Sequence, residues 1–255
     1  MAAQFETGHA KNVANFNSLV SFCQGYGNTY NPALTAIQLS KLQTLAATAL
    51  TALEDCKSKQ LDYDQAVDAR MLAFAELRPL SQKMLYALKA SGAPALSVEG
   101  AMTIYRKIQG RRKTAKEELS EAGSPDAGAE SGVTPGQEQQ YISVSQLSFD
   151  NVLANFSALV SLVTKVSAYQ PNETALQVSS LTAYIAALQA ANMLVANSYT
   201  DWSNLRISRN ALLYGNGSGL VAVAGQVKNY VKSIYGLQSP QYKQLSGLQF
   251  ITGRN

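Results

Sequence analysis

The sequence predicts an all-α protein: an elongated antiparallel helical bundle built from two tandem copies of a helix–long helix–helix unit. Apolar residues recur every 3.5 residues on average from Leu39 to Leu77, and the same recurrence returns from Val178 to Leu213. Similar sequence blocks also appear in the same order in both halves of the chain. These two observations together lead to the predicted fold class.

The first recurrence predicts one long helix. Its steps alternate between three and four residues, and neither Gly nor Pro lies between Pro32 and Pro79, so we expect a helix roughly 60–70 Å long. A protein that exposed an apolar stripe of this length would be insoluble, so the helix needs other helices packed along its length. The seam positions are Leu39, Leu42, Ala46, Ala49, Leu53, Cys56, Gln60, Tyr63, Val67, Arg70, Phe74 and Leu77.

Internal similarity predicts a duplication. The block NVANFNSLVS near the start resembles the later NVLANFSALVS, YNPALTAIQLSKL resembles YQPNETALQVSSL, and YRKIQG resembles YKQLSG. We therefore expect repeat 1 over residues 1–112 and repeat 2 over residues 145–255. The intervening residues 113–144 are acidic and rich in Gly, Ser and Pro, which is typical of a flexible linker.

Local signals place the elements of each repeat. An amphipathic helix opens each one, and Ser148 is a suitable N-cap for the second. Turns at Tyr30-Asn31-Pro32 and Tyr169-Gln170-Pro171 then lead into the long helices. The first long helix should kink or end at Arg78-Pro79, and the second should end at Gly215–Gly219.

A third helix is expected next in each repeat. It spans Leu80–Ser91 in repeat 1 and Leu220–Tyr235 in repeat 2. The closing segment of repeat 1 is expected to be helical from Ser97. That of repeat 2 is shorter and ends in a tail that docks through Leu248, Phe250 and Ile251.

Several sequence motifs in the repeats resemble those of known proteins. The motifs NFxxLVS and YxP, and above all VKNYVKSIYGLQSPQYKQLSGLQF at residues 227–250, resemble a group of uncharacterised bacterial tandem helical-repeat proteins. The resemblance implies a bacterial origin and no particular activity.

Composition favours association and an intracellular setting. The net charge is +4, but only 15% of the residues are charged, so a weakly charged surface tolerates self-association. Residues 1–25 lack a signal-peptide pattern, and no stretch reaches about 18 uninterrupted apolar residues. Cys23 and Cys56 should lie too far apart for a disulfide. We expect a cytoplasmic protein with two free thiols, or a component of a larger particle.

Groups suited to catalysis are scarce. His9 is the single histidine, expected to be exposed in a frayed first turn. Neither a Cys/His cluster with metal spacing nor a Glu-x-x-His pair is present, and Gly215–Gly219 follows a helix and lacks the lysine of a phosphate loop. We therefore expect no enzymatic activity, no metal and no cofactor.

Four seam residues are candidates for an interface or registry role. Arg70 and Arg209 occupy equivalent seam positions where apolar residues belong, so each either fixes helix alignment or extends to solvent. Expected partners are Asp62, Asp68 or Glu76 for the first and Asp201 or helix-end carbonyls for the second. Tyr63 and Trp202, also equivalent, either form a stacking platform or belong to the core.

One dense basic patch follows repeat 1. It either contacts nucleic acid or is a solvated helix end beside the acidic linker. Its residues are Arg106, Lys107, Arg111, Arg112, Lys113 and Lys116.

These features lead first to a non-enzymatic structural or scaffolding protein that self-associates into an oligomer or ordered assembly. A helical-bundle pore former or membrane-surface binder is the alternative, motivated by the apolar stretches Leu39–Leu53 and Leu181–Val195. Nucleic-acid binding through residues 106–116 is the third and weakest hypothesis.

Overall fold

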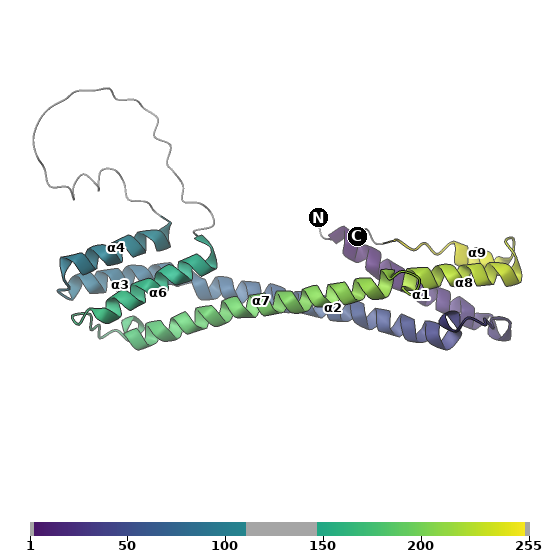
Figure 1. The fold of residues 1–255 in the computed structure, drawn as a ribbon, viewed down its shortest axis with the longest axis horizontal. Coiled ribbons are helices and arrows are strands. Elements are labelled where there is room, and N and C mark those ends of the chain that lie inside the picture. Colours follow the sequence, from purple (N-terminus) through teal and green to yellow (C-terminus); the bar gives the residue numbers. More distant parts are fainter. Residues whose placement is uncertain (1–2, 111–146, 253–255) are drawn as a thin grey trace, which may run out of the picture. The chain divides into compact units, whose positions relative to one another are not determined.

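The computed structural model describes residues 3–110 and 147–252, and every regular element within those ranges is helical (Figure 1). This confirms the all-α fold class. The predicted linker over residues 113–144 lies outside the described ranges. The described residues divide into two compact units, which are considered separately: those up to Gln65 and from Asn197 onward form unit 1, and those between Ala66 and Ala196 form unit 2.

The two long helices have the same length. Helices α2 (Leu39–Ala75) and α7 (Val178–Tyr214) each contain 37 residues, and each contributes its first part to one unit and its last part to the other. Most predicted seam positions are buried or half-buried, whereas Tyr199 and Arg206 of the second seam are exposed. The heptad recurrence therefore identified both helices and most of their buried faces.

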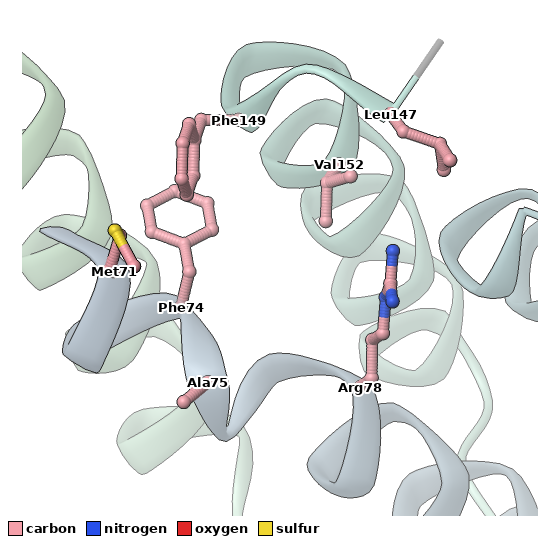
Figure 2. A pocket seen from close by; sticks show the side chains of 7 residues that line it. All are labelled: Met71, Phe74, Ala75, Arg78, Leu147, Phe149 and Val152. Carbon is pink, nitrogen blue, oxygen red and sulfur yellow. The ribbon is translucent and has the colours of Figure 1, made fainter. Parts of the chain in front are cut away.

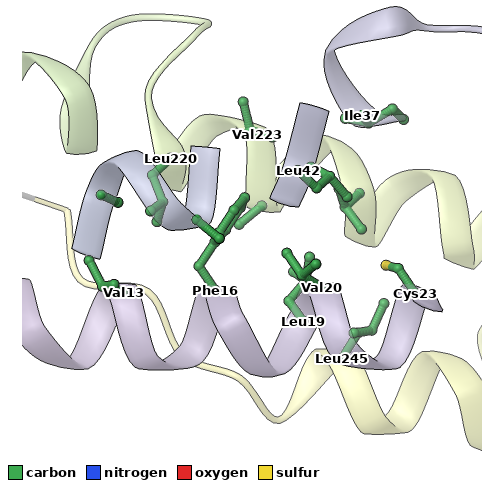
Figure 3. Close-up of a cluster of buried hydrophobic side chains, with 14 of the residues drawn as sticks. Val13, Phe16, Leu19, Val20, Cys23, Ile37, Leu42, Leu220, Val223 and Leu245 are labelled. Atoms are coloured by element: carbon green, nitrogen blue, oxygen red, sulfur yellow. The ribbon is translucent and has the colours of Figure 1, made fainter. Parts of the chain in front are cut away.

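Unit 1 has a continuous apolar core (Figure 3). Helix α1 (Ala3–Gly25) packs against α8 (Leu220–Tyr235) and α9 (Pro240–Ser246), alongside the unit 1 parts of α2 and α7. Phe16, Leu19 and Leu42 are fully buried in this core. Each such side chain contributes about 1.5–3 kcal/mol by leaving water.

Unit 2 has a second core of the same kind. Helix α6 (Phe149–Lys165) packs against α3 (Leu77–Ala90) and α4 (Ala95–Gln109), alongside the unit 2 parts of α2 and α7. Phe156 and Leu188 are among its fully buried members. As predicted, Ser148 caps α6, its hydroxyl accepting a hydrogen bond from the Asn151 backbone N–H at 3.3 Å.

The compact units are composed differently from the predicted repeats. Each unit joins residues from both repeats, because the opening helix of one repeat packs against the closing helices of the other. Residues 1–112 and 145–255 therefore do not coincide with the two bodies into which the contacts divide the chain. Periodicity shows which face of a helix is buried, but it does not identify the helix that covers that face.

The ends of the long helices follow backbone chemistry. Helix α2 ends at Ala75, before the predicted break at Arg78-Pro79. Pro79 is instead the third residue of α3, where a backbone N–H has no partner within the helix. After α7, a side chain at Gly219 would lie 2.5 Å from the Gly215 nitrogen, and Gly217 has φ +74°. Only glycine fits both constraints, so this run forms the tight turn that separates α7 from α8.

Matching tyrosines close the turns before the long helices. The Tyr30 hydroxyl donates to the Ile37 carbonyl at 2.6 Å, and the Tyr169 hydroxyl donates to the Leu176 carbonyl at 3.0 Å. Both tyrosines are buried. Each hydrogen bond fixes the chain two residues before a long helix begins.

The C-terminal tail lies against α1 and α8 of unit 1. The Asn12 side chain accepts from the Ile251 N–H and donates to the Ile251 carbonyl, both at 2.8 Å, and Asn15 donates to the Gln249 carbonyl at 2.6 Å. Leu248 and Phe250 pack against the unit 1 core. The tail is therefore held by hydrogen bonds from asparagine side chains to its backbone and by Leu248 and Phe250, whereas the predicted apolar anchor Ile251 is 50% exposed.

Candidate functional site

The aromatic seam residues pack together in unit 1. The rings of Tyr63 and Trp202 stack with centroids 5.6 Å apart and planes 21° from parallel, and the exposed Tyr199 contacts both. The Arg206 guanidinium lies 4.9 Å from the Trp202 ring centroid. Such contacts contribute about 0.5–1.5 kcal/mol each beyond burial. The indole is thus engaged by neighbouring side chains rather than presented as an open platform.

Arg209 lies in a buried polar cluster of unit 1. It is only 2% exposed, and its Nη2 lies 3.1 Å from His9 Nε2 and 3.2 Å from Asn210 Oδ1. Because arginine only donates hydrogen bonds, His9 Nε2 must be the acceptor, and the imidazole proton is assigned to Nδ1, 2.7 Å from the Tyr214 hydroxyl. Arg209 therefore does not extend to solvent.

The position of His9 corrects a sequence expectation. The predicted exposed histidine in a frayed turn is wrong, because His9 is 8% exposed and contacts residues about 200 positions away. Asn12, which holds the tail, also donates to the Tyr214 hydroxyl at 3.3 Å. The cluster thus ties α1, the end of α7 and the C-terminal tail together. This geometry indicates a structural role for the cluster.

Arg70 has a different environment in unit 2. It is half-buried, and its Cζ atom lies 4.2 Å from the centroid of the Phe149 ring at the start of α6. Its Nε is buried without a hydrogen-bond partner among the described residues. The expected partner Asp62 instead pairs with Lys59 at 2.9 Å on the surface. Both seam arginines therefore contact a ring near the start of an opening helix.

A shallow hollow of about 360 Å³ lies near Arg70 in unit 2 (Figure 2). Phe74 and Phe149 meet edge to face along one side, with centroids 4.8 Å apart, and Arg78 is the one ionisable residue in the lining. General acid–base catalysis needs positioned proton donors and acceptors, which this lining does not supply. No group of three His, Cys, Asp or Glu that could hold a metal occurs in the described ranges 3–110 and 147–252.

Only part of the predicted basic patch can be placed. Arg106 and Lys107 lie in the last turn of α4, where cations complement the helix dipole, and Gly110 ends the helix with φ 72°. Arg111, Arg112, Lys113 and Lys116 lie outside the described residues.

The exposed side of α7 in unit 2 is apolar. Six exposed residues share it, and we call them the α7 face: Ala183, Ala186, Ala187, Ala190, Met193 and Leu194. Met193 is 64% exposed and Leu194 is 52% exposed. Helix α7 carries no charged residue from Val178 to Thr200.

The corresponding side of α2 is mostly polar. The positions that lie 139 residues earlier in the chain are also exposed, and they are Thr44, Ala47, Thr48, Thr51, Glu54 and Asp55. Thr44 and Thr48 donate to backbone carbonyls of their own helix, each at 2.9 Å. The two long helices thus have equal length and comparable seams, but five of these six exposed positions are polar or acidic on α2 and apolar on α7. Sequence reasoning missed this contrast, although comparing the repeats outside the seam would have found it.

Helix α7 is also the one helix in the described residues that is long and apolar enough to cross a membrane by length and composition. Only 17% of its most apolar window is buried. The sequence expectation counted uninterrupted apolar residues, whereas in this helix uncharged polar residues interrupt the apolar ones.

No family model, no curated protein and no solved structure matches this chain. Its function is therefore inferred from its own sequence and structure.

Proposed function

We propose that the protein is a non-enzymatic structural component that self-associates through the α7 face. The observation that carries this proposal is a contrast between the two long helices: five of the six compared exposed positions are polar or acidic on α2 and are Ala, Met or Leu on α7. If the α7 face contacted only water, polar residues like those of α2 would suffice at these positions. Its apolar residues therefore favour a partner for this face.

The α7 face has the properties of a helix–helix contact. Its four alanines allow a second helix to approach closely, and Met193 and Leu194 supply apolar area at one end. The absence of charge from Val178 to Thr200 removes repulsion between two identical surfaces. A second copy of the same face is the simplest partner, because identical patches pair around a twofold axis.

Sedimentation velocity over a range of concentrations tests the proposal with a variant taken from the protein itself. The double variant Met193→Glu/Leu194→Asp introduces the residues that α2 carries at the equivalent positions. Each copy would lose two apolar side chains that the proposed contact buries, so association should weaken by at least about a hundredfold. Circular dichroism should remain unchanged, because both positions are exposed.

A matched control separates this effect from added charge alone. Leu96 lies on α4 of the same unit and is 80% exposed, so Leu96→Glu adds charge to another exposed leucine. This variant should associate like the wild type. A wild-type protein that stays monomeric at high concentration would refute the proposal, as would equal association of both variants.

Membrane-surface binding is a second candidate function, favoured by the low burial of α7. It predicts that the protein sediments with lipid vesicles, and that Met193→Glu/Leu194→Asp reduces this binding. Vesicle binding that is unaffected by the double variant would exclude α7 as the lipid contact.

A further inference from the structure

We propose that one end of unit 1 is a docking surface for an anionic lipid membrane. This end is formed by the connection between α1 and α2, residues 26–38, and by the turn between α8 and α9, residues 236–239 (Figure 1). It is separate from the α7 face, and the inference does not depend on self-association.

Tyrosines hold the two segments together. The rings of Tyr26 and Tyr235 lie 5.5 Å apart, and those of Tyr30 and Tyr230 meet edge to face at 5.3 Å. The Tyr230 hydroxyl accepts from the Asn31 N–H at 3.1 Å, and the Tyr26 hydroxyl donates to the Gln241 carbonyl at 3.0 Å. These cross-links make the end a preformed surface, which lowers the entropy lost on binding.

Apolar side chains project from this braced end into solvent. Leu34 and Leu237 are each 53% exposed, and Ile234 in the last turn of α8 is also exposed. Leucines and isoleucine beside partly exposed tyrosines match the composition of segments that enter the headgroup region of a bilayer. The tyrosines suit the boundary between water and hydrocarbon because their rings are apolar and their hydroxyls polar.

The positive charge of this end of unit 1 favours an anionic partner. Lys41 lies in the first turn of α2, Lys232 in the last turn of α8 and Lys243 on α9, and all three are exposed. The described residues 8–53 and 202–252, which supply this end, contain no acidic residue. An apolar tip with only positive charge around it is complementary to an anionic lipid surface, where each nearby cation strengthens binding.

The second repeat provides a natural contrast. The position equivalent to Leu34 is Glu173, which is exposed and precedes the matching short helix η4 (Thr174–Leu176) in unit 2. A carboxylate at this position opposes contact with an anionic surface. The lipid assignment therefore concerns unit 1.

Co-sedimentation of the full chain with vesicles tests the inference. The probe is an equimolar mixture of phosphatidylcholine and phosphatidylglycerol at low salt, compared with phosphatidylcholine alone. The wild type should sediment with the anionic vesicles, and added salt should weaken this binding. Replacing both leucines, as Leu34→Glu/Leu237→Glu, should reduce the partition coefficient by at least about tenfold.

Matched variants make each result decisive. Leu96→Glu, an exposed leucine of unit 2, should sediment within about twofold of the wild type. Lys232→Glu/Lys243→Glu should lose the preference for anionic vesicles. A wild type that stays in the supernatant would overturn the inference. So would loss of binding in Met193→Glu/Leu194→Asp alone, or a leucine variant that alters oligomer size but not vesicle binding.

Discussion

Removing the Asn12 side chain should loosen the C-terminal tail and destabilise unit 1. The side chain is fully buried, and it makes two hydrogen bonds of 2.8 Å to the backbone of Ile251. A typical net contribution is about 0.5–1.5 kcal/mol for each hydrogen bond, so Asn12→Ala should cost about 1–3 kcal/mol. Ile251 is itself exposed, so water can replace part of what is lost.

Urea denaturation followed by tryptophan fluorescence reports this change directly. Trp202 is the single tryptophan of the chain, and it lies in unit 1. With a denaturant slope of about 2 kcal/mol per molar urea, the midpoint should fall by about 0.5–1.5 M. Trypsin should also cleave after Lys243 faster than in the wild type, because the tail beyond it is less firmly held.

Two further variants test the role of geometry. Asn15→Ala removes an exposed hydrogen bond to the Gln249 carbonyl and should cost less than about 0.5 kcal/mol. Asn12→Asp keeps the acceptor for the Ile251 N–H but loses the donor to its carbonyl, and it buries a charge, so it should be at least as destabilising as Asn12→Ala. Equal midpoints for Asn12→Ala, Asn15→Ala and the wild type would refute the account of the tail.

Three other predictions follow from buried hydroxyl and thiol groups. Burial raises the pKa of the Cys23 thiol to about 11, so an aromatic disulfide reagent at pH 8 should modify this position only after unfolding, and rapid modification of the folded protein would contradict its burial. Burial raises the pKa of Tyr26 and of Tyr169 to about 12, above the ordinary value of about 10, and raises the pKa of Tyr30 further still. The folded state favours the neutral phenol, so the stabilisation is complete below pH 10 and is lost as pH rises toward 12. The tyrosinate absorbance that Tyr26→Phe or Tyr169→Phe removes, taken as the difference from the wild type, should appear together with the change in circular dichroism, and its appearance near pH 10 in a fully helical protein would oppose the assignment. Tyr30→Phe and Tyr169→Phe each remove one equivalent hydroxyl bond and should each cost about 1 kcal/mol in thermal or urea unfolding, whereas Tyr86→Phe, at an exposed tyrosine, should be neutral.

Local signals in the sequence were sufficient to predict the elements. Heptad spacing located both long helices, the glycine run placed the end of α7, and Ser148 marked the start of α6. Each signal acts over a few residues, within the range that propensity and capping govern. The predicted third helix of repeat 2, Leu220–Tyr235, has the bounds of α8.

Local sequence signals do not predict contacts between side chains that are far apart in the sequence. His9 was expected in solvent because a single polar residue near a chain end carries no periodic signal, yet its partners are Tyr214 and Arg209. Arg70 was expected to pair with a nearby acid, but it lies over the ring of Phe149 from another helix. Such contacts depend on which helices pack together, and the hydrophobic pattern leaves that choice open.

The chain order of unit 1 has a consequence for how the protein is made. Its described residues up to Gln65 pack against those from Asn197 onward, so the opening segment must wait until residues 66–196 have been translated before its partners exist. Closing contacts between such distant segments is entropically demanding and slow. During that interval, chaperones that bind exposed apolar helices would have access to Phe16 and Leu19, the residues that the finished core conceals.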